Sequence, residues 1–287
     1  MIDYELLAIN PGYAGRFFEA EAAITAKIAS VSLEALMTSQ DGDEEQSPLL
    51  QVENDVGLVT VKGTLTDRYS VYNRFFGMVS YDEIMQATHQ AVDAGVGAIM
   101  YLYDTPGGKV SGMAAAAEEI SSLETPTITF TSSSMASAGY FLGIQSDEVY
   151  ADSFAEVGSV GIVMKTYDRS QYLAEIGVKP IRFRSGKLKA VGDQDFKMTS
   201  QEEKYLQKKV DTFAMKFFNI VSEARGLPLP VLKKNGVTSG RTFIGEEALQ
   251  AQLVDGMKTF DESMWAAYVA AKKTVDKRNK AGLSYKY

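Results

Sequence analysis

The chain has 287 residues, 45% hydrophobic and 23% charged, which is enough apolar material for one large domain or two smaller ones. Its 29 basic and 37 acidic side chains give a formal net charge of −8, which argues against a surface built to coat nucleic acid. The absence of cysteine excludes disulfides, thiolate nucleophiles and iron–sulfur clusters, and a single histidine disfavours a transition-metal enzyme. We therefore expect no metal and no cofactor.

The N-terminal sequence carries acidic residues early and lacks a basic, apolar leader. No apolar run approaches the ~20 residues that a membrane-spanning helix needs. We therefore expect a soluble, cytoplasmic protein.

The first part of the chain is predicted to be an accessory arm. Residues 3–37 have the spacing of an amphipathic helix, and an acidic, proline-terminated stretch follows at 39–48. We divide the chain into an N-terminal arm and linker over residues 1–52, a main domain over 53–260 and a basic tail over 261–287. From Lys272 onward the tail is expected to be frayed or used in contacts.

The main domain alternates between predicted strands and predicted helices. Apolar runs predict strands at 56–63, 96–104, 127–131, 148–151, 160–168 and 181–185. Amphipathic or small-residue segments predict helices at 80–95, 113–123, 135–147, 169–180, 199–226 and 246–256. The nearly continuous apolar run at 96–104 is typical of a strand buried on both faces of a parallel sheet. This alternation indicates an α/β fold.

A glycine-rich turn, DTPGGKV at 104–110, follows one of these strands and precedes a helix. Gly107 and Gly108 permit a sharp backbone turn and leave an amide exposed without a Cβ in the way. Such an amide suits an anion or a developing oxyanion. An ordinary strand-to-helix turn has the same pattern, so this motif alone does not distinguish an anion-binding turn from a structural one.

A second small-residue stretch, TSSSMASAGYF at 131–141, follows the next strand. Ser137 is expected inside the first turn of the helix, and the three serines at 132–134 are expected to be loop and N-cap residues. The alanines on either side of Ser137 leave room beside its hydroxyl for an acyl group, and the N–H of Ala138 is a candidate oxyanion donor.

The structural alternative is a helix of small residues packed tightly against the sheet. Two such motifs at the carboxyl ends of neighbouring strands favour a functional site, because ligand sites gather there in α/β sheets.

A serine nucleophile needs a base. His89 lies near the edge of the apolar face of the predicted helix 80–95 and is interpreted as a partly buried structural residue. The other candidate is a lysine, whose pKa must fall from ~10.4 to near neutrality if it is to accept a proton. Lys187 and Lys189 both follow the predicted strand 181–185, and strand alternation points them to the same side. Spacing alone does not choose between these two lysines.

Taken in order, five motifs resemble the signal peptide peptidase A family, which are Ser/Lys peptidases of the ClpP/crotonase superfamily. The motifs are DTPGGKVSG, SMASAGYF, VGSVGIVM, FRSGKLK and MTSQEEK. The likeness runs from about Val56 to about Val254. Within the family the chain is most similar to the lambda-type phage capsid assembly (head maturation) proteases, through VKGTLTDR at 61–68, the DTPGG form of the turn and the FF pair at 17–18.

The resemblance implies a ClpP/crotonase-like spiral of β-β-α units with a C-terminal helical region and an N-terminal helical arm. It also implies a role for each candidate site residue: Ser137 as nucleophile, Lys189 as general base, and Gly107, Gly108 and Ala138 as oxyanion or substrate-binding groups. Ala190 follows Lys189 where the family often has Asp, which keeps Lys187 as the alternative base.

The same resemblance implies a ring-like homo-oligomer in which the serine and the lysine can come from different subunits. The implied substrates are scaffold, portal or capsid proteins, cleaved in the host cytoplasm or inside the procapsid.

Two other functions are compatible with these motifs. A crotonase-like acyl-CoA hydratase or isomerase uses paired oxyanion amides with carboxylates as acid and base, and it does not need Ser137. A catalytically inactive scaffold or shell component on the same fold is the non-enzymatic alternative.

Overall fold

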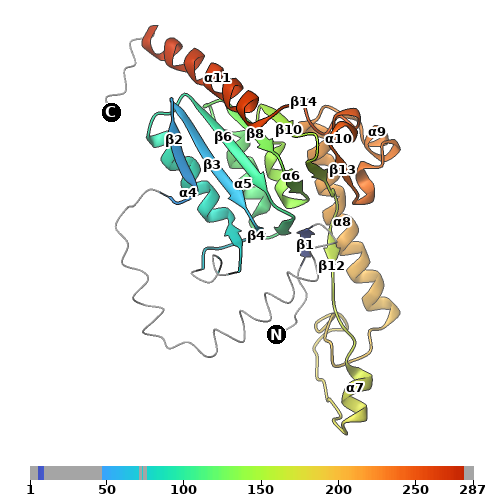
Figure 1. Cartoon of the computed structure of the whole chain (residues 1–287). Helices are drawn as coiled ribbons and strands as arrows, with labels where there is room; N and C mark the ends of the chain where they lie inside the picture. Colours follow the sequence, from blue (N-terminus) through green and yellow to red (C-terminus); the bar gives the residue numbers. More distant parts are fainter. Residues whose placement is uncertain (1–5, 10–46, 71–72, 74–75, 281–287) are drawn as a thin grey trace, which may run out of the picture.

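A six-stranded sheet forms the centre of the computed structural model, which describes residues 6–9, 47–70, 73 and 76–280. Its order is β14 (Gly256–Met257), β10 (Glu148–Ala151), β8 (Thr127–Thr131), β6 (Ala98–Asp104), β3 (Val56–Lys62) and β2 (Leu50–Glu53). Neighbouring strands are parallel except for β2, which pairs antiparallel with β3 (Figure 1). The strands predicted at 56–63, 96–104, 127–131 and 148–151 are confirmed, and so is the α/β class.

Helices cover both faces of this sheet, as the apolar runs require. Alternate residues of β6 point to opposite faces, so Ile99 and Tyr101 join one core cluster whereas Ala98 and Met100 join another. The first cluster includes residues of α4 (Tyr81–Asp93), α5 (Met113–Ser121) and α6 (Ala138–Gly143). The second includes residues of α11 (Phe260–Lys280), which lies across the other face (Figure 1).

Two of the predicted helices have their start fixed by a capping box. Ser80 and Glu83 exchange side-chain and backbone hydrogen bonds at the start of α4, and Thr199 and Glu202 do the same at the start of α8 (Ser200–Ala224). The other helices are shorter than predicted: α5, α6, α7 (Ser170–Glu175) and α10 (Glu246–Gln250), with α9 (Leu229–Lys234) as an additional short helix.

The tail from Lys272 onward was expected to be frayed or used in contacts, and up to Lys280 the second expectation is confirmed. These residues continue α11, which is held on the sheet by buried Ala267 and Ala271 and by Arg278, whose guanidinium donates to the Gly95 carbonyl at 2.9 Å. Residues 281–287 lie outside the described residues.

Two smaller sheets adjoin the central one. The first has the order β12 (Val163–Met164), β1 (Leu6–Ile9), β7 (Gly107–Lys109), β4 (Thr64–Thr66) and β5 (Met78–Ser80). The second has the order β13 (Thr242–Ile244), β11 (Glu156–Gly158) and β9 (Ser134–Ala136). Strand β1 corrects the prediction of a helix over 3–37, because pairing on both of its edges outweighs a helical spacing. The rest of that prediction lies outside the described residues.

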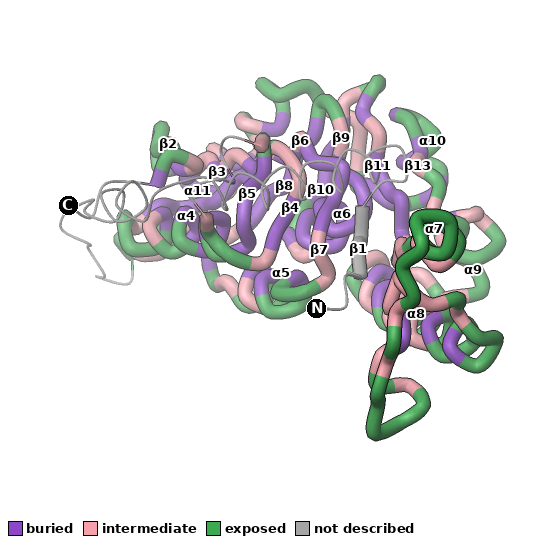
Figure 2. The backbone as a smooth tube through the Cα atoms, turned by 90° about the horizontal axis from the view of Figure 1, so that it is seen from below, coloured by how far each residue is buried: buried purple, intermediate pink, exposed green. Residues whose placement is uncertain are grey.

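Residues 165–198, here called the projecting segment, run from β12 to α8 and extend away from the sheets (Figures 1 and 2). The predicted strand 181–185 is wrong, since this stretch is irregular, and of the predicted strand 160–168 only β12 forms. Ile181 is 75% exposed and Phe183 is 94% exposed. A strand needs a partner for its backbone groups, and the described residues of this chain provide none here.

Two arginines join the projecting segment to the start of α8. Arg184 lies 2.8 Å and Arg182 3.9 Å from the buried Glu202 carboxylate, measured between nitrogen and oxygen. The backbone N–H of Thr199 and the Arg184 guanidinium lower the pKa of Glu202 from 4.5 to about 2.

This arrangement predicts a specific dependence of stability on pH. Because the folded pKa of Glu202 lies below its ordinary value, its contribution is fully present above about pH 4.5 and is lost as the pH falls toward 2. Glu202→Gln is expected to lower the thermal midpoint at neutral pH, and the difference from wild type is expected to shrink through that range. Thermal denaturation at a series of pH values measures it, with the exposed Glu203→Gln as matched control. A difference that stays constant down to about pH 2 would contradict the assignment.

Candidate active site

Ser137 lies at a sharp turn between a strand and a helix. Strand β9 ends at Ala136 and α6 begins at Ala138, so Ser137 is the N-cap and not, as predicted, a residue inside the first turn. Its backbone angles are φ 54° and ψ −113°, a region that favours glycine and that costs other residues about 1–3 kcal/mol. The same strand, strained turn and helix present the nucleophile in α/β-hydrolases.

Ser137 is only 1% exposed. Its hydroxyl is buried and has no hydrogen-bond partner among the described residues. Buried hydroxyl groups nearly always have a partner, so this one requires an explanation. The backbone of the same residue is well anchored, because its N–H donates to the Gly158 carbonyl at 2.7 Å. The turn is therefore held in place by its backbone while the side-chain hydroxyl is left unpaired.

Hydrogen bonds join the serine motif to the glycine turn. The N–H of Thr105 donates to the Ser134 carbonyl at 2.7 Å, and the N–H of Ala136 donates to the Thr105 carbonyl at 3.1 Å. Ser134 belongs to β9, which corrects its predicted role in a loop or cap. The structure thus brings together three of the five motifs, those around Gly108, Ser137 and Gly158.

The two glycines of the turn have different surroundings. The N–H of Gly107 donates to the Thr105 hydroxyl at 3.1 Å, so it is already used inside the turn. A Cβ on Gly108 would lie 1.9 Å from the Leu65 carbonyl oxygen, so only glycine fits beside β4. The N–H of Ala138, the first residue of α6, has no acceptor within its helix. Gly108 and Ala138 are therefore the better candidates for oxyanion donors.

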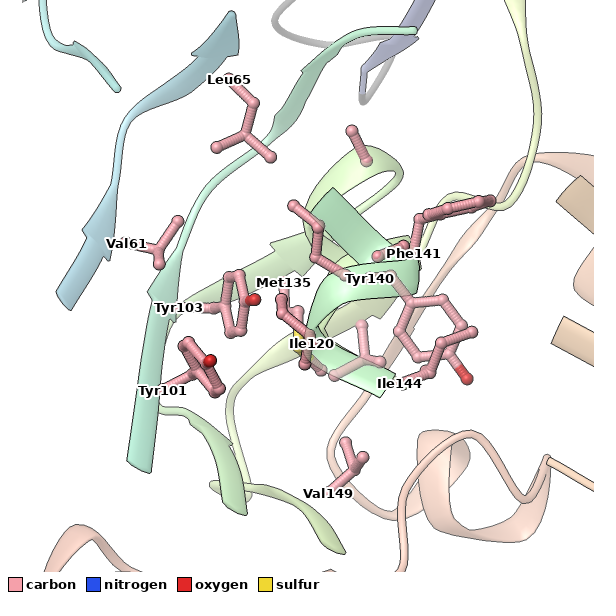
Figure 3. Close-up of a cluster of buried hydrophobic side chains, with 14 of the residues drawn as sticks. Val61, Leu65, Tyr101, Tyr103, Ile120, Met135, Tyr140, Phe141, Ile144 and Val149 are labelled. Atoms are coloured by element: carbon pink, nitrogen blue, oxygen red, sulfur yellow. The ribbon is translucent and has the colours of Figure 1, made fainter. Parts of the chain in front are cut away.

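Helix α6 is also packed tightly against its neighbours, as expected if its small residues serve only to pack the helix against the sheet. A Cβ on Gly139 would lie 2.2 Å from the Thr105 side chain, and a Cβ on Gly143 would lie 2.4 Å from the Met135 sulfur. Figure 3 shows the α6 side chains Tyr140 and Phe141 in one buried cluster with Met135. The Tyr140 hydroxyl donates to the Leu253 carbonyl at 2.9 Å. Tight packing explains the small residues of α6 but not the strained, unpaired Ser137.

The structure does not bring either candidate lysine to Ser137. Lys187 and Lys189 are exposed in a turn of the projecting segment, where the N–H of Lys189 donates to the Gly186 carbonyl at 3.1 Å. No hydrogen bond or ion pair between the described residues joins these lysines to the serine turn. The choice between Lys187 and Lys189 stays open.

His89 is not the partly buried residue that its position predicted. Its side chain is 59% exposed and pairs with Glu119 of α5. It lies on the outer side of α4, because the inner positions of that helix are taken by residues such as Ile84 and Ala91.

Two parts of the site were missed by sequence reasoning. Gly158 was recognised only as part of a glycine-rich motif, whereas its carbonyl anchors the Ser137 backbone. Strand β1 was assigned to a helix, whereas it pairs with Gly107 and Gly108. The signal for β1 was the run LLAI, four residues long, which is too short to distinguish a strand from a helix.

A hollow of about 510 Å³ adjoins β12 on the side of α8. Its apolar lining includes Ile162, Val163, Met215 and Phe218.

The described residues hold no group of three or more carboxylate or histidine side chains placed to bind a metal ion. None of the helices formed by the described residues has both the length and the apolar character that a membrane-spanning helix requires.

Comparison with known proteins gives a consistent result. The family model described as peptidase family S49 matches residues 119–274. Capsid assembly protease C of Escherichia phage lambda is 29% identical over 267 residues, which cover 88% of this chain and 60% of that protein. A putative signal peptide peptidase SppA of Enterococcus faecium is 28% identical over 166 residues, covering 57% of this chain and 48% of that protein.

A putative protease of Methanocaldococcus jannaschii is 26% identical over 174 residues, covering 60% of this chain and 55% of that protein. The chain thus spans between 48% and 60% of the length of these three relatives.

Proposed function

Because the chain belongs to peptidase family S49, we propose that it is a serine endopeptidase with Ser137 as nucleophile and Lys189 as general base. The observation that carries this proposal is the Ser137 turn, with its strained backbone and its buried, unpaired hydroxyl. A ClpP/crotonase-like spiral is part of the proposal, and the parallel central sheet with two smaller sheets beside it supports it.

The reaction follows from the groups at the turn. Neutral Lys189 accepts the proton of Ser137, and the serine oxygen attacks a peptide carbonyl carbon. The N–H groups of Gly108 and Ala138 hold the oxygen that becomes negative in the tetrahedral intermediate. The lysine returns its proton to the leaving amine, and it then activates the water that hydrolyses the acyl-enzyme.

In this proposal the lysine is supplied by a neighbouring subunit of a ring-like homo-oligomer. The lysine lies on the projecting segment, which extends away from its own serine turn (Figure 1). The segment also exposes apolar side chains that are suited to a protein–protein contact: Tyr167, Tyr172, Ile176, Val178, Ile181 and Phe183. Burial against a second subunit would also remove water from the ammonium group and lower its pKa, as the mechanism requires.

The relative from phage lambda is called a capsid assembly protease. We extend this role to the present chain and propose scaffold, portal or capsid proteins as its substrates during head maturation in the host cytoplasm.

The experiment that tests the proposal is a comparison of two reactions. Purified protein is incubated with an unfolded protein substrate and, separately, with a panel of enoyl-CoA thioesters. Peptide-bond hydrolysis without hydration of the thioesters is the expected result. Hydration without proteolysis would favour the crotonase-like alternative, and inactivity in both assays would favour a shell or scaffold component.

A substitution of Gly108 tests the oxyanion assignment. Gly108→Ala is expected to lower kcat by about 10²–10³-fold, because its Cβ must push the turn away from Leu65 and displace the amide. Initial rates and thermal midpoints measure the effect. Gly161→Ala is the matched control for folding, since its Cβ would meet only the Gly240 Cα, at 3.8 Å. A wild-type kcat in Gly108→Ala would rule out that amide as a donor.

A further inference from the structure

The strand β1 lies between the glycine turn and β12. On one edge it runs antiparallel to β7, and the register pairs Leu7, Ala8 and Ile9 with Lys109, Gly108 and Gly107 in turn. On the other edge it runs antiparallel to β12, with Leu6 opposite Met164 and Leu7 opposite Val163. In the described sheet, β7 and β12 are joined only through β1, the short dark-blue arrow of Figure 1.

This position is where an extended peptide substrate is expected to bind. A peptide between β7 and β12 forms main-chain hydrogen bonds on both of its edges, as in recognition by strand addition. Strand β7 contains Gly108, whose amide is the proposed oxyanion donor. The substrate residue opposite Gly108 is therefore the one whose carbonyl lies nearest to the oxyanion donors. In β1 that residue is Ala8.

We propose that Leu6–Ile9 occupies the substrate groove and acts as an intramolecular inhibitor that protein substrates must displace. The proposal rests on the proposed function in one respect, that the groove between β7 and β12 is where the peptidase binds its substrate. The chemistry of the segment agrees with this place, because LLAI is wholly apolar and about half of the residues that line the hollow beside β12 are apolar, Ile162 and Val163 among them.

Covalent attachment makes such a short strand an effective competitor. A segment that belongs to the same chain as its binding site has an effective concentration of the order of millimolar. A four-residue strand that binds with a Kd of about 0.1 mM then raises the apparent KM of an external substrate roughly tenfold. Removing the segment is expected to reverse this effect without changing the chemical step.

A binding measurement tests the proposal independently of catalysis. It uses a fluorescent peptide of residues 4–12, YELLAINPG, and two forms of the Ser137→Ala protein, one with the full chain and one lacking residues 1–9. We expect the peptide to bind the shortened form about tenfold more tightly, and a peptide of scrambled sequence to bind neither. Equal affinity for the two forms, or for the two peptides, would overturn the proposal.

A second variant keeps the full length of the chain. Ala8→Pro removes the backbone N–H of Ala8 and disfavours a strand paired on both edges. The Ser137→Ala protein that also carries Ala8→Pro is expected to bind the peptide more tightly than the full-length Ser137→Ala protein with Ala8 unchanged. Wild-type affinity in Ala8→Pro would count against the proposal even if the shortened chain failed to fold.

Kinetics separate the failure of this proposal from the failure of the proposed function. In the active enzyme, loss of residues 1–9 is expected to lower KM about tenfold with kcat unchanged. If both forms cleave with the same KM, the inhibitory role is refuted and the peptidase assignment stands. If neither form cleaves, the peptidase assignment fails, and the binding measurement still decides whether the segment occupies the groove.

Discussion

Ser137→Ala is expected to abolish peptide-bond hydrolysis, lowering kcat by about 10⁴–10⁶-fold while the protein stays folded. In the proposed mechanism the substitution removes the atom that forms the acyl-enzyme, and the oxyanion amides alone would leave only a small residual rate. Initial rates on a protein substrate measure the loss. Cleavage at the wild-type rate would show that another residue is the nucleophile.

The same variant is expected to be at least as stable as the wild type. The Ser137 hydroxyl is buried without a partner, so its removal breaks no hydrogen bond between described residues. Ser137→Gly is expected to be more stable still, because glycine adopts φ 54° and ψ −113° without the strain that serine pays. In thermal denaturation, Ser137→Gly should have the highest midpoint, Ser137→Ala the next and the wild type the lowest. The reverse order would mean that the hydroxyl has a structural role.

Lys189→Ala is expected to be as inactive as Ser137→Ala, whereas Lys187→Ala keeps most of its activity. Only an unprotonated amine within hydrogen-bonding distance of the serine can act as base, and these two side chains lie two residues apart on the same exposed turn. They therefore serve as matched controls for each other. Full activity in Lys189→Ala together with none in Lys187→Ala would assign the base to Lys187.

Mixing two inactive proteins tests whether the base comes from a neighbouring subunit. If the chain forms the proposed ring, mixed rings of Ser137→Ala and Lys189→Ala contain some sites that combine an intact serine from one subunit with an intact lysine from the next. Activity is expected to recover to a fraction of the wild-type value after the subunits are exchanged. Rings that demonstrably mix but stay inactive would place both groups in one subunit.

The central sheet was predictable because its signals are local and strong. The apolar run of β6 and the capping boxes at Ser80 and Thr199 fix elements without reference to the rest of the chain. The glycine turn and the serine motif were predictable as a pair because consecutive parallel strands end at the same edge of a sheet. The structure then supplied what sequence does not encode locally, namely the strained backbone of Ser137 and its bond to Gly158.

Three of the failed predictions concern positions whose structure depends on tertiary context. The predicted strand 181–185 has suitable residues but no partner among the described residues of its own chain. Strand β1 has a helical spacing in sequence and becomes a strand because β7 and β12 flank it. His89 has the position of a half-buried residue, yet it lies beyond the edge of the packed face of α4. Tertiary context outweighs local pattern in each case.

Reaction with a fluorophosphonate, followed by mass mapping of the modified peptide, tests the central claim most directly. A serine whose proton is removed by a nearby base attacks phosphorus and keeps a covalent adduct, whereas an ordinary buried hydroxyl does not react. The account predicts a single adduct on Ser137, which is lost in Ser137→Ala and in Lys189→Ala. An active protein whose adduct maps to a different residue, or whose Ser137 stays unmodified, would contradict it.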